Sequence, residues 1–167
     1  MKPLWAPWRM DYIRDEKGRC EPKSGCVFCL DTETDCDTER LVLFRGEHTF
    51  VIMNRFPYNN GHLLVTPYRH VADICDLLPE ESQELFDLIC LSREVLQTTL
   101  APQGLNIGLN LGEAAGAGIA DHLHWHLVPR WQGDTNFMPV LAETRVIPQH
   151  LVTTYELLSA AFAGRIR

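Results

Sequence analysis

Apolar runs separated by short polar segments dominate the chain from residue 41 onward, and most of them have the length of β-strands. Leu41–Phe44 and Thr49–Met53 are split by the polar segment Arg45–His48, a pattern typical of a β-hairpin. Three more strands are predicted, the last of them ended by Pro129: His62–Thr66, Leu105–Leu111 and His122–Val128.

Two longer segments show the spacing of amphipathic helices. The first runs from Pro79 to about Leu100, and its proline at the first position and acidic first turn favour a helix start. Its apolar stripe consists of Leu85, Phe86, Ile89 and Leu96. The second covers residues 148–163, with Leu151, Tyr155, Leu158 and Phe162 on one side. Strands joined by short turns, together with two helices, predict an α+β fold built on an antiparallel sheet of about five strands.

The first 40 residues differ in composition from the rest of the chain. An aromatic arm that contains prolines is followed by a polar loop with four cysteines: Cys20, Cys26, Cys29 and Cys36. We therefore predict two parts, an N-terminal arm with a cysteine-containing loop over residues 1–40 and a single domain over residues 41–167.

Composition and charge narrow the class of protein. A chain of 167 residues is long enough for one domain with its own core. Its formal net charge of −7 argues against broad nucleic-acid or membrane-surface binding, which needs a basic field. No apolar run approaches the roughly 20 residues of a membrane-spanning helix, and the N-terminus shows no secretory signal. We expect a cytoplasmic protein whose six cysteines are free or metal-bound, with Cys75 and Cys90 in the core.

Three histidines stand at alternate positions of one predicted strand: His122, His124 and His126. Alternate strand residues face the same way, so these rings would line one face over about 13 Å. Leu123, Trp125 and Leu127 would face the opposite side, into a core. Three titratable rings on a packed face are costly without partners. Metal ligation or catalysis is therefore favoured over a solvent-facing polar stripe.

The pair Cys26-Val-Phe-Cys29 is a second candidate site. A CxxC pair can serve redox chemistry, bind zinc or arise by chance. The flanking sequence does not have the βαβ pattern of a redox unit. A zinc site needs four ligands, usually cysteine and histidine, in tetrahedral geometry.

The motif His122-Leu-His124-Trp-His126-Leu-Val resembles the signature of the histidine triad (HIT) family. Segments 54–67 and 110–118 are similar to the strand–loop–strand and the glycine-rich loop that precede the triad in that family. Further similarity in segments 4–12, 108–112 and 128–137 extends over nearly the whole chain. It indicates the bacterial diadenosine tetraphosphate phosphorylase branch. The resemblance implies the HIT fold and a homodimer, formed through the main helix and the adjacent strand.

The resemblance also implies a reaction, the cleavage of dinucleoside polyphosphates through a nucleotidyl-histidine intermediate. A neutral imidazole is a suitable nucleophile near pH 7 because its pKa is about 6.5. By position, His124 is expected to be the nucleophile and His126 to orient the leaving group and the phosphate oxygens. His62 would help to fix the imidazole tautomer. Two alternatives stay open: a Hint-like hydrolase of nucleoside phosphoramidates, and a non-catalytic, zinc-stabilised nucleotide-binding module.

Binding roles follow from the same matching positions. Asn54 is expected to hold the ribose hydroxyls, and Asn110 to reach a phosphate. Gly116 and Gly118 would allow backbone N–H groups to approach an anion. Some hydrolytic members carry glutamine four residues before the first histidine, where this chain has Gly118. The missing amide leaves room for a second anion, so inorganic phosphate is a candidate acceptor.

Zinc-bearing members of the family pair a CxxC with two histidines. The corresponding residues here are Cys26, Cys29, His70 and His122. The resemblance therefore implies a structural Zn²⁺ that ties the polar loop to the sheet and adds to folding stability. Cys20 or His48 remains an alternative for one ligand.

Overall fold

The computed structural model describes residues 25–30, 36–134 and 149–165. The predicted aromatic arm and Cys20 lie outside these ranges, so the division into two parts stays a prediction. Among the described residues, no helix combines the length and the apolar character needed to cross a membrane.

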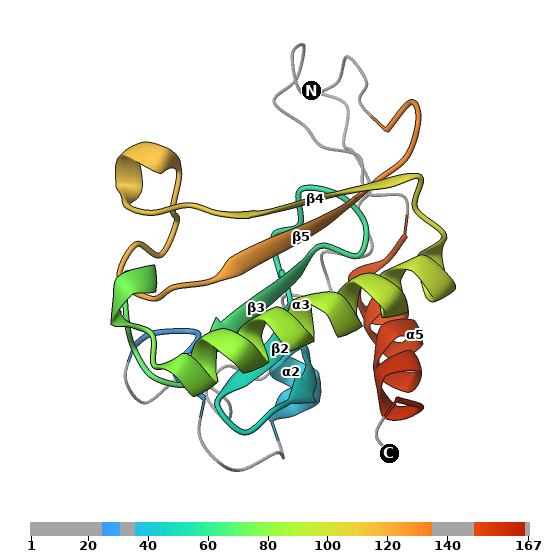
Figure 1. The fold of residues 1–167 in the computed structure, drawn as a ribbon. Helices are drawn as coiled ribbons and strands as arrows, with labels where there is room; N and C mark the ends of the chain where they lie inside the picture. Colours follow the sequence, from blue (N-terminus) through green and yellow to red (C-terminus); the bar gives the residue numbers. More distant parts are fainter. Residues whose placement is uncertain (1–24, 31–35, 135–148, 166–167) are drawn as a thin grey trace, which may run out of the picture.

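A single antiparallel sheet forms the centre of the fold (Figure 1). Its strand order is β1-β2-β3-β5-β4, so each of the first three strands pairs with its neighbour in sequence, and β5 inserts between β3 and β4. The five predicted strands are therefore confirmed as elements. Their bounds are β1 Val42–Arg45, β2 Thr49–Met53, β3 Leu63–Pro67, β4 Gly104–Leu109 and β5 Trp125–Arg130.

The two predicted helices cover one face of this sheet (Figure 1). Helix α3, Pro79–Leu100, contacts β2, β3 and β5, and helix α5, Leu151–Ala163, contacts β1 and α3. A short helix that the sequence did not predict, α2, covers Asp37–Arg40. Two 3₁₀ turns, η1 at Ile74–Asp76 and η2 at Glu113–Ala115, complete the described elements.

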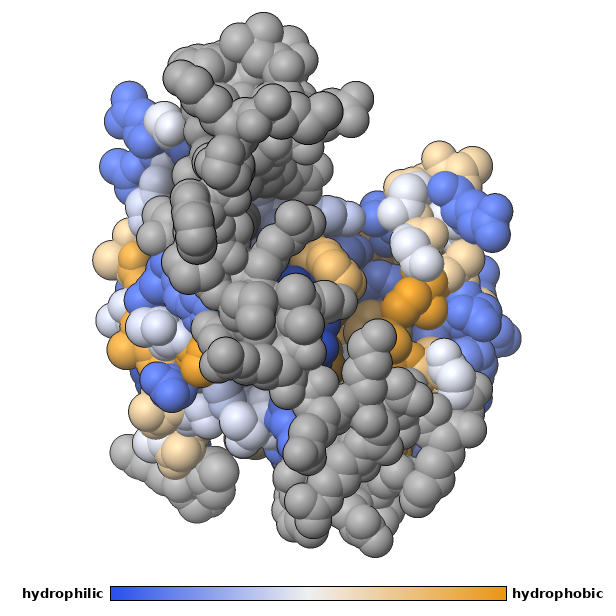
Figure 2. All heavy atoms as spheres, turned by 180° about the vertical axis from the view of Figure 1, so that it is seen from behind, coloured by the Kyte–Doolittle hydropathy of each residue, from blue (hydrophilic) through white to orange (hydrophobic). Residues whose placement is uncertain are grey.

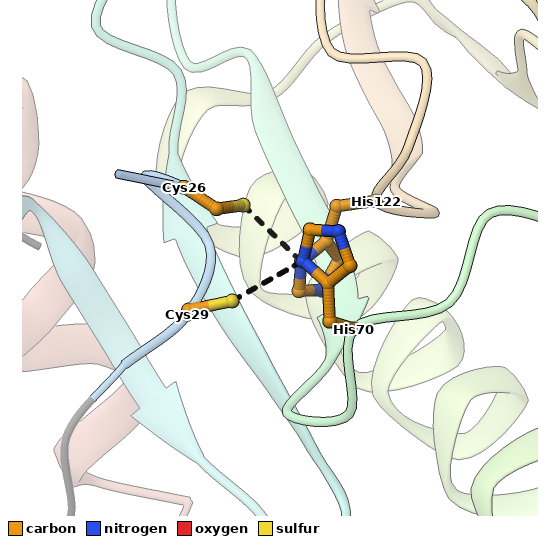
Figure 3. Close-up of side chains that lie close together, drawn as sticks. All are labelled: Cys26, Cys29, His70 and His122. Carbon is orange, nitrogen blue, oxygen red and sulfur yellow. Dashed lines mark hydrogen bonds between the residues drawn. The ribbon is translucent and has the colours of Figure 1, made fainter. Parts of the chain in front are cut away.

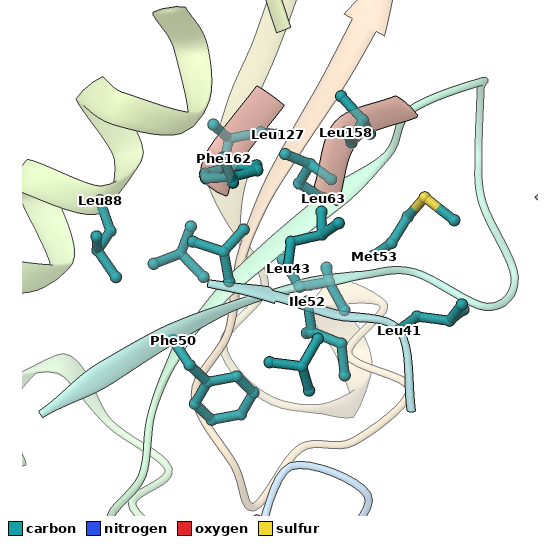
Figure 4. Packing of buried hydrophobic residues seen from close by; sticks show 14 of the residues in the cluster. Leu41, Leu43, Phe50, Ile52, Met53, Leu63, Leu88, Leu127, Leu158 and Phe162 are labelled. Atoms are coloured by element: carbon teal, nitrogen blue, oxygen red, sulfur yellow. The ribbon is translucent and has the colours of Figure 1, made fainter. Parts of the chain in front are cut away.

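The hydrophobic core fills the space between the helices and the sheet and continues on the opposite face of the sheet, where Phe50, Ile52 and Leu64 lie (Figure 4). Apolar side chains from the sheet, α3 and α5 meet in this core. Removing their surface from water is the main favourable contribution to the free energy of folding. The prediction was wrong for three residues near the helices. Phe86 is 63% exposed, and the thiols of Cys75 and Cys90 are also exposed. The most deeply buried residues of the hydrophobic core are Phe50, Val51, Leu63, Val65, Leu96, Leu127, Leu158 and Phe162.

The strand of the histidines begins later than predicted. The ladder between β3 and β5 starts at Val65 and Trp125, so His122 and His124 precede the strand, and Pro129 lies within it. Pro67, at the end of β3, explains why the β3–β5 ladder does not extend further, because proline has no N–H to donate to it. The hydroxyl of Thr66 instead donates to the carbonyl of Leu123, at 2.7 Å.

Gly61 holds the backbone in a conformation that brings His62 to the start of β3. Its φ is +71°, in the left-handed region that glycine adopts without steric penalty. A Cβ at this position would also overlap the side chain of Leu100 on α3. The pair Gly61-His62 is therefore fixed by packing as well as by backbone geometry.

The carboxylate of Glu84, on α3, anchors the β1–β2 turn. It accepts hydrogen bonds from the backbone N–H groups of Glu47, His48 and Thr49 at 2.6–2.7 Å and from the Thr49 hydroxyl at 2.9 Å. Burial alone would raise the pKa of Glu84, but these hydrogen bonds outweigh it and lower the pKa below its ordinary value. Gly46 is required beside it, because a Cβ there would meet the carboxylate at 2.6–2.9 Å.

Replacing Glu84 by glutamine should lower the free energy of unfolding by about 2 kcal/mol, because charge-assisted hydrogen bonds are lost and the amide NH₂ faces backbone donors. Urea denaturation at pH 7 measures this difference. The matched control is Glu47→Gln, on an exposed residue of the same turn, and it should change stability little. Equal stability of the two variants would contradict the anchoring role.

Candidate functional site

A cavity of about 600 Å³ opens on the sheet face opposite the helices. Cross-strand pairing places Ile52, Leu64 and His126 side by side on this face, whereas Leu127 alternates into the core. Seen from that side, apolar side chains reach the surface between hydrophilic ones (Figure 2). The volume suits a small organic ligand. The cavity is lined by Val27, Phe28, Arg40, Ile52, Met53, Asn54, Arg55, Phe56, Tyr58, Leu64, Gly118, Ile119, His124 and His126.

His124 has one ring nitrogen fixed by the backbone. Its Nδ1 lies 2.8 Å from the carbonyl oxygen of His122. A carbonyl oxygen only accepts, so Nδ1 carries the proton and the neutral ring keeps its lone pair on Nε2. The side chain is 7% exposed and lines the cavity. The hydrogen bond therefore leaves Nε2 of His124 as a basic nitrogen, able to act as a nucleophile.

His62 and His126 form a directed pair of imidazoles. The backbone N–H of Tyr58 donates to Nδ1 of His62 at 3.1 Å, so the proton of His62 is on Nε2. That Nε2–H donates to Nδ1 of His126 at 2.9 Å, and the proton of His126 is then on its own Nε2. This Nε2 is buried and has no hydrogen-bond partner among the described residues. A buried donor without a partner at a cavity wall indicates a place for a ligand acceptor.

Aromatic rings enclose the two cavity histidines. The rings of His124 and His126 are 4.9 Å apart, measured between centroids. Tyr58 stacks on His126 at 5.7 Å with an interplanar angle of 17°, and Phe28 packs on His124 at 4.8 Å. These contacts restrict ring rotation and keep water from the nitrogen atoms that are not exposed to the cavity.

Burial keeps these imidazoles neutral. It lowers the pKa of His124 below its ordinary value, against the opposing effect of the hydrogen bond to the His122 carbonyl. Burial, together with the nearby His124, lowers the pKa of His126 from 6.5 to about 4. Both rings are therefore uncharged near pH 7, which is the state that a nucleophile and a neutral donor require.

The lowered pKa of His126 predicts a specific pH dependence of stability. Between pH 6.5 and about 4 the unfolded chain binds a proton at this residue that the native chain does not bind. The contribution of His126 to the free energy of unfolding is therefore fully present above pH 6.5, and it is lost as the pH falls toward 4. Urea denaturation from pH 7 to pH 4.5 should show a smaller loss of stability for His126→Gln than for the wild type. A His126 ring resonance that titrates near 6.5 in NMR spectra would contradict the prediction.

Next to the cavity, four side chains converge on one point (Figure 3). Their ligand atoms all lie within 4.8 Å of one another: Sγ of Cys26 and Cys29, and ring nitrogens of His70 and His122. Nδ1 of His122 is 3.4 Å from Sγ of Cys26 and 3.2 Å from Nδ1 of His70, and Sγ of Cys29 is 3.3 Å from Nδ1 of His70. The four residues predicted from the sequence are thus brought together, and they could hold a metal ion.

The chemistry of the donor atoms fits such an ion. A tetrahedral zinc site with two thiolates and two imidazoles places its ligand atoms about 3.3 to 3.8 Å apart. Nε2 of His122 donates to the carbonyl of Pro67 at 2.9 Å, which leaves the lone pair on Nδ1, facing the cluster. Nε2 of His70 lies 3.6 Å from a carboxylate oxygen of Asp121, a typical outer-shell arrangement for a metal-binding histidine.

Among the described residues, the cluster contains no other cysteine. His48 is not a member of it, and Cys20 lies outside the described residues. Cys75 and Cys90 are free thiols on the surface. Cys36 is disulfide-bonded, so the expectation that all cysteines are free or metal-bound was wrong for this residue.

The predicted substrate-binding residues fall into two groups. Asn54 and Gly118 line the cavity, and the side-chain oxygen of Asn54 accepts a hydrogen bond from the backbone of Phe56 at 2.9 Å. Asn110 and Gly116 do not line it. The amide of Asn110 lies 3.5 Å from the carbonyl of Gly116, within their own loop.

Several lining residues were not singled out from the sequence as members of the site. Val27 and Phe28 stand between the two cysteines, and that position was their only signal. Tyr58 lies in segment 54–67, whose resemblance gave it no specific role. Arg40 gave no signal, because an arginine before a strand is common in any protein.

Comparison with known proteins agrees with this architecture. A family model described as HIT domain matches residues 37–133. The chain is 40% identical, over 166 residues, to AP-4-A phosphorylase from Mycobacterium tuberculosis, a match that covers 98% of this chain and 85% of that protein.

Solved structures with the same fold include a zinc-bound histidine triad family protein from Mycobacterium smegmatis. It superimposes with a TM-score of 0.64 at 28% identity and covers 84% of this chain and 95% of its own. A histidine triad nucleotide-binding protein from Sulfolobus tokodaii gives a TM-score of 0.62 at 24% identity, over 83% of this chain and 90% of that chain, and supports the fold alone.

Proposed function

This chain belongs to the HIT family, and on that basis we propose that it is an enzyme that cleaves dinucleoside polyphosphates through a nucleotidyl-histidine intermediate. One observation carries the proposal. The basic Nε2 assigned to His124 and the unpartnered Nε2–H assigned to His126 belong to neighbouring rings in the wall of one cavity. A nucleophile beside a neutral donor is the arrangement that displacement at a phosphate requires.

The cavity supports a placement of the substrate. The apolar part of the lining suits an adenine ring, and Asn54 is proposed to bind the ribose hydroxyls through its amide. The α-phosphate then lies beside His124 and His126, where the backbone N–H of Gly118 can approach it. Asn110 and Gly116 remain proposed contacts for the distal phosphates on the neighbouring loop.

The first step is displacement at the α-phosphorus. Nε2 of His124 forms the new P–N bond, and the bond between the α-phosphorus and the bridging oxygen breaks. The leaving polyphosphate takes the electron pair, and the Nε2–H of His126 donates a hydrogen bond to that oxygen. His62 positions His126 by donating to its Nδ1, a role that the 2.9 Å contact supports.

The second step transfers the nucleotidyl group from His124 to an acceptor. With water the product is AMP, whereas with inorganic phosphate it is ADP. Gly118 lines the cavity without a side chain, so the space beside the α-phosphate suits a second anion. We propose phosphate as the acceptor, a proposal that the 40% identity to a protein named AP-4-A phosphorylase supports.

A product assay tests this function. The purified protein is incubated with diadenosine tetraphosphate, with and without inorganic phosphate. We expect ATP and ADP as products and a rate that rises with phosphate concentration. Equal rates with AMP as product would show a hydrolase and contradict the phosphate acceptor. Turnover of a nucleoside phosphoramidate alone would indicate a Hint-like hydrolase, and AMP binding without turnover a non-catalytic module.

We also propose that the ion at Cys26, Cys29, His70 and His122 is a structural Zn²⁺. The supporting observations are the convergence of two thiols and two imidazoles and the zinc-bound family member with the same fold. Zinc would supply no reaction step at this position. It would tie the CxxC segment to the sheet and add its binding free energy to that of folding.

The assembly proposed for the chain is a homodimer. β4 is an edge strand of the described sheet and exposes Ile107, and α3 exposes Phe86. These apolar side chains support pairing through the main helix and the adjacent strand. A mass of one chain in analytical ultracentrifugation would contradict it. A cytoplasmic location, without nucleic-acid or membrane partners, remains a proposal based on the net charge of −7.

A further inference from the structure

One residue, His122, connects the metal cluster to the proposed nucleophile His124. Its ring nitrogen Nδ1 faces both cysteines and His70, and its carbonyl oxygen accepts the Nδ1–H of His124 at 2.8 Å. The His122 side chain is completely buried, and its second ring nitrogen is held by the carbonyl of Pro67 at 2.9 Å. The residue that faces the cluster through its ring is therefore the same residue whose carbonyl orients His124.

A second connection runs through Phe28, which stands between the two cysteines. Its side chain is 4% exposed and touches both histidines, with ring centroids 4.8 Å from His124 and 5.5 Å from His122. Phe28 and its neighbour Val27 also line the cavity. One short segment thus supplies two metal ligands, a wall of the cavity and the packing surface of the nucleophile.

Core packing of Phe28 and several hydrogen bonds hold this segment in place. Cys26–Cys29 belongs to no helix or strand, and within it the N–H of Cys29 donates to the carbonyl of Cys26 at 3.2 Å. Arg40 donates to the carbonyls of Val27 and Cys29 at 3.1 and 3.4 Å. Its thiols contact the ring nitrogens of His70 and His122.

We propose that metal binding at this cluster sets the geometry of the catalytic cavity, with Phe28 as the positioning residue that holds the His124 ring. The proposal rests on the function proposed above and goes beyond a purely structural role of the ion. Without the ion, weak S···N contacts of 3.3–3.8 Å join the thiols to the ring nitrogens, whereas a bound ion would hold all four ligand atoms by coordination bonds. The segment can then withdraw, Phe28 leaves the face of His124, and water reaches the nucleophile.

The first test separates positioning from stability. Phe28→Ala should keep its zinc and its circular dichroism spectrum but lose about 100-fold in kcat, since misplacement of a reacting group by about 1 Å has this effect. Phe28→Leu retains bulk against the ring and should recover most of the loss. Phe44→Ala, a partly buried phenylalanine that packs on Phe162, is the control that should lower stability but not kcat. A kcat within threefold of wild type in zinc-loaded Phe28→Ala would overturn the proposal.

The second test needs no turnover. Long-range ¹H–¹⁵N spectra report which nitrogen of His124 carries the proton, and calorimetry reports the affinity for AMP. Zinc-loaded protein should show one Nδ1–H state of His124, whereas zinc-free protein should show mixed states and at least tenfold weaker AMP binding, reversed by added zinc. An unchanged His124 signal and unchanged AMP affinity in folded, zinc-free protein would refute the proposal. If zinc-free protein unfolds, Phe28→Ala is compared with wild type by the same two readouts.

These readouts also distinguish the inference from the function on which it rests. Absence of dinucleotide cleavage by the wild type would contradict the proposed function. The His124 tautomer and its dependence on zinc and Phe28 would still be measured in that protein. Cys75→Ser, a free surface thiol outside the cluster, should leave both readouts unchanged.

Discussion

Replacing His124 by alanine should reduce the cleavage of diadenosine tetraphosphate by a factor of about 10⁴ or more, because loss of a covalent nucleophile removes the reaction path and not only part of its stabilisation. The cavity would keep the other lining residues, so AMP binding should change far less than kcat. Steady-state kinetics and calorimetry on the same preparation measure both effects. Rapid quenching into alkali, followed by mass spectrometry, should detect a nucleotidyl adduct on the wild type and none on the variant.

The matched control is His150→Ala, which makes the same substitution at an exposed histidine before α5. It should retain full activity. His124→Ala with activity within tenfold of the wild type would exclude His124 as the nucleophile. An adduct that persists in the variant would transfer that role to a different residue.

The second large effect concerns the metal cluster. Zinc-loaded wild type should be more stable than zinc-free wild type by about 4 kcal/mol when free zinc exceeds its dissociation constant 1,000-fold. Cys29→Ser should abolish that difference, because the site keeps three ligands and loses a thiolate. Urea denaturation with and without zinc measures the stability, and elemental analysis should find about one zinc per wild-type chain.

Cys75→Ser is the control for this experiment as well, since it removes an exposed thiol that no metal ligand contacts. Its zinc content and its zinc-dependent stabilisation should equal those of the wild type. Zinc well below one per chain in reconstituted wild type would contradict the assignment. Full zinc binding by Cys29→Ser would exclude Cys29 as a ligand.

The local pattern of apolar and polar residues predicted the ends of those elements that are set by neighbouring residues in the sequence. β2 was predicted with its observed bounds, and α3 begins at Pro79 as its first turn indicated. The same reasoning failed for Phe86, because adjacent apolar residues on a helix do not reveal which of them faces the sheet. It also failed for the start of β5, which depends on Pro67 in a neighbouring strand.

The sequence by itself determined the family and the fold class and supplied the candidate site residues, because the alternation of His122, His124 and His126 and the CxxC pair are visible along the chain. Only the tertiary structure showed which nitrogen of each ring carries the proton. A tautomer depends on the partner of the other nitrogen, and those partners are contributed by the Pro67 carbonyl, by His62 and by backbone groups far apart in sequence. Three equally spaced histidines therefore have different hydrogen-bond partners, which support the different roles proposed for them.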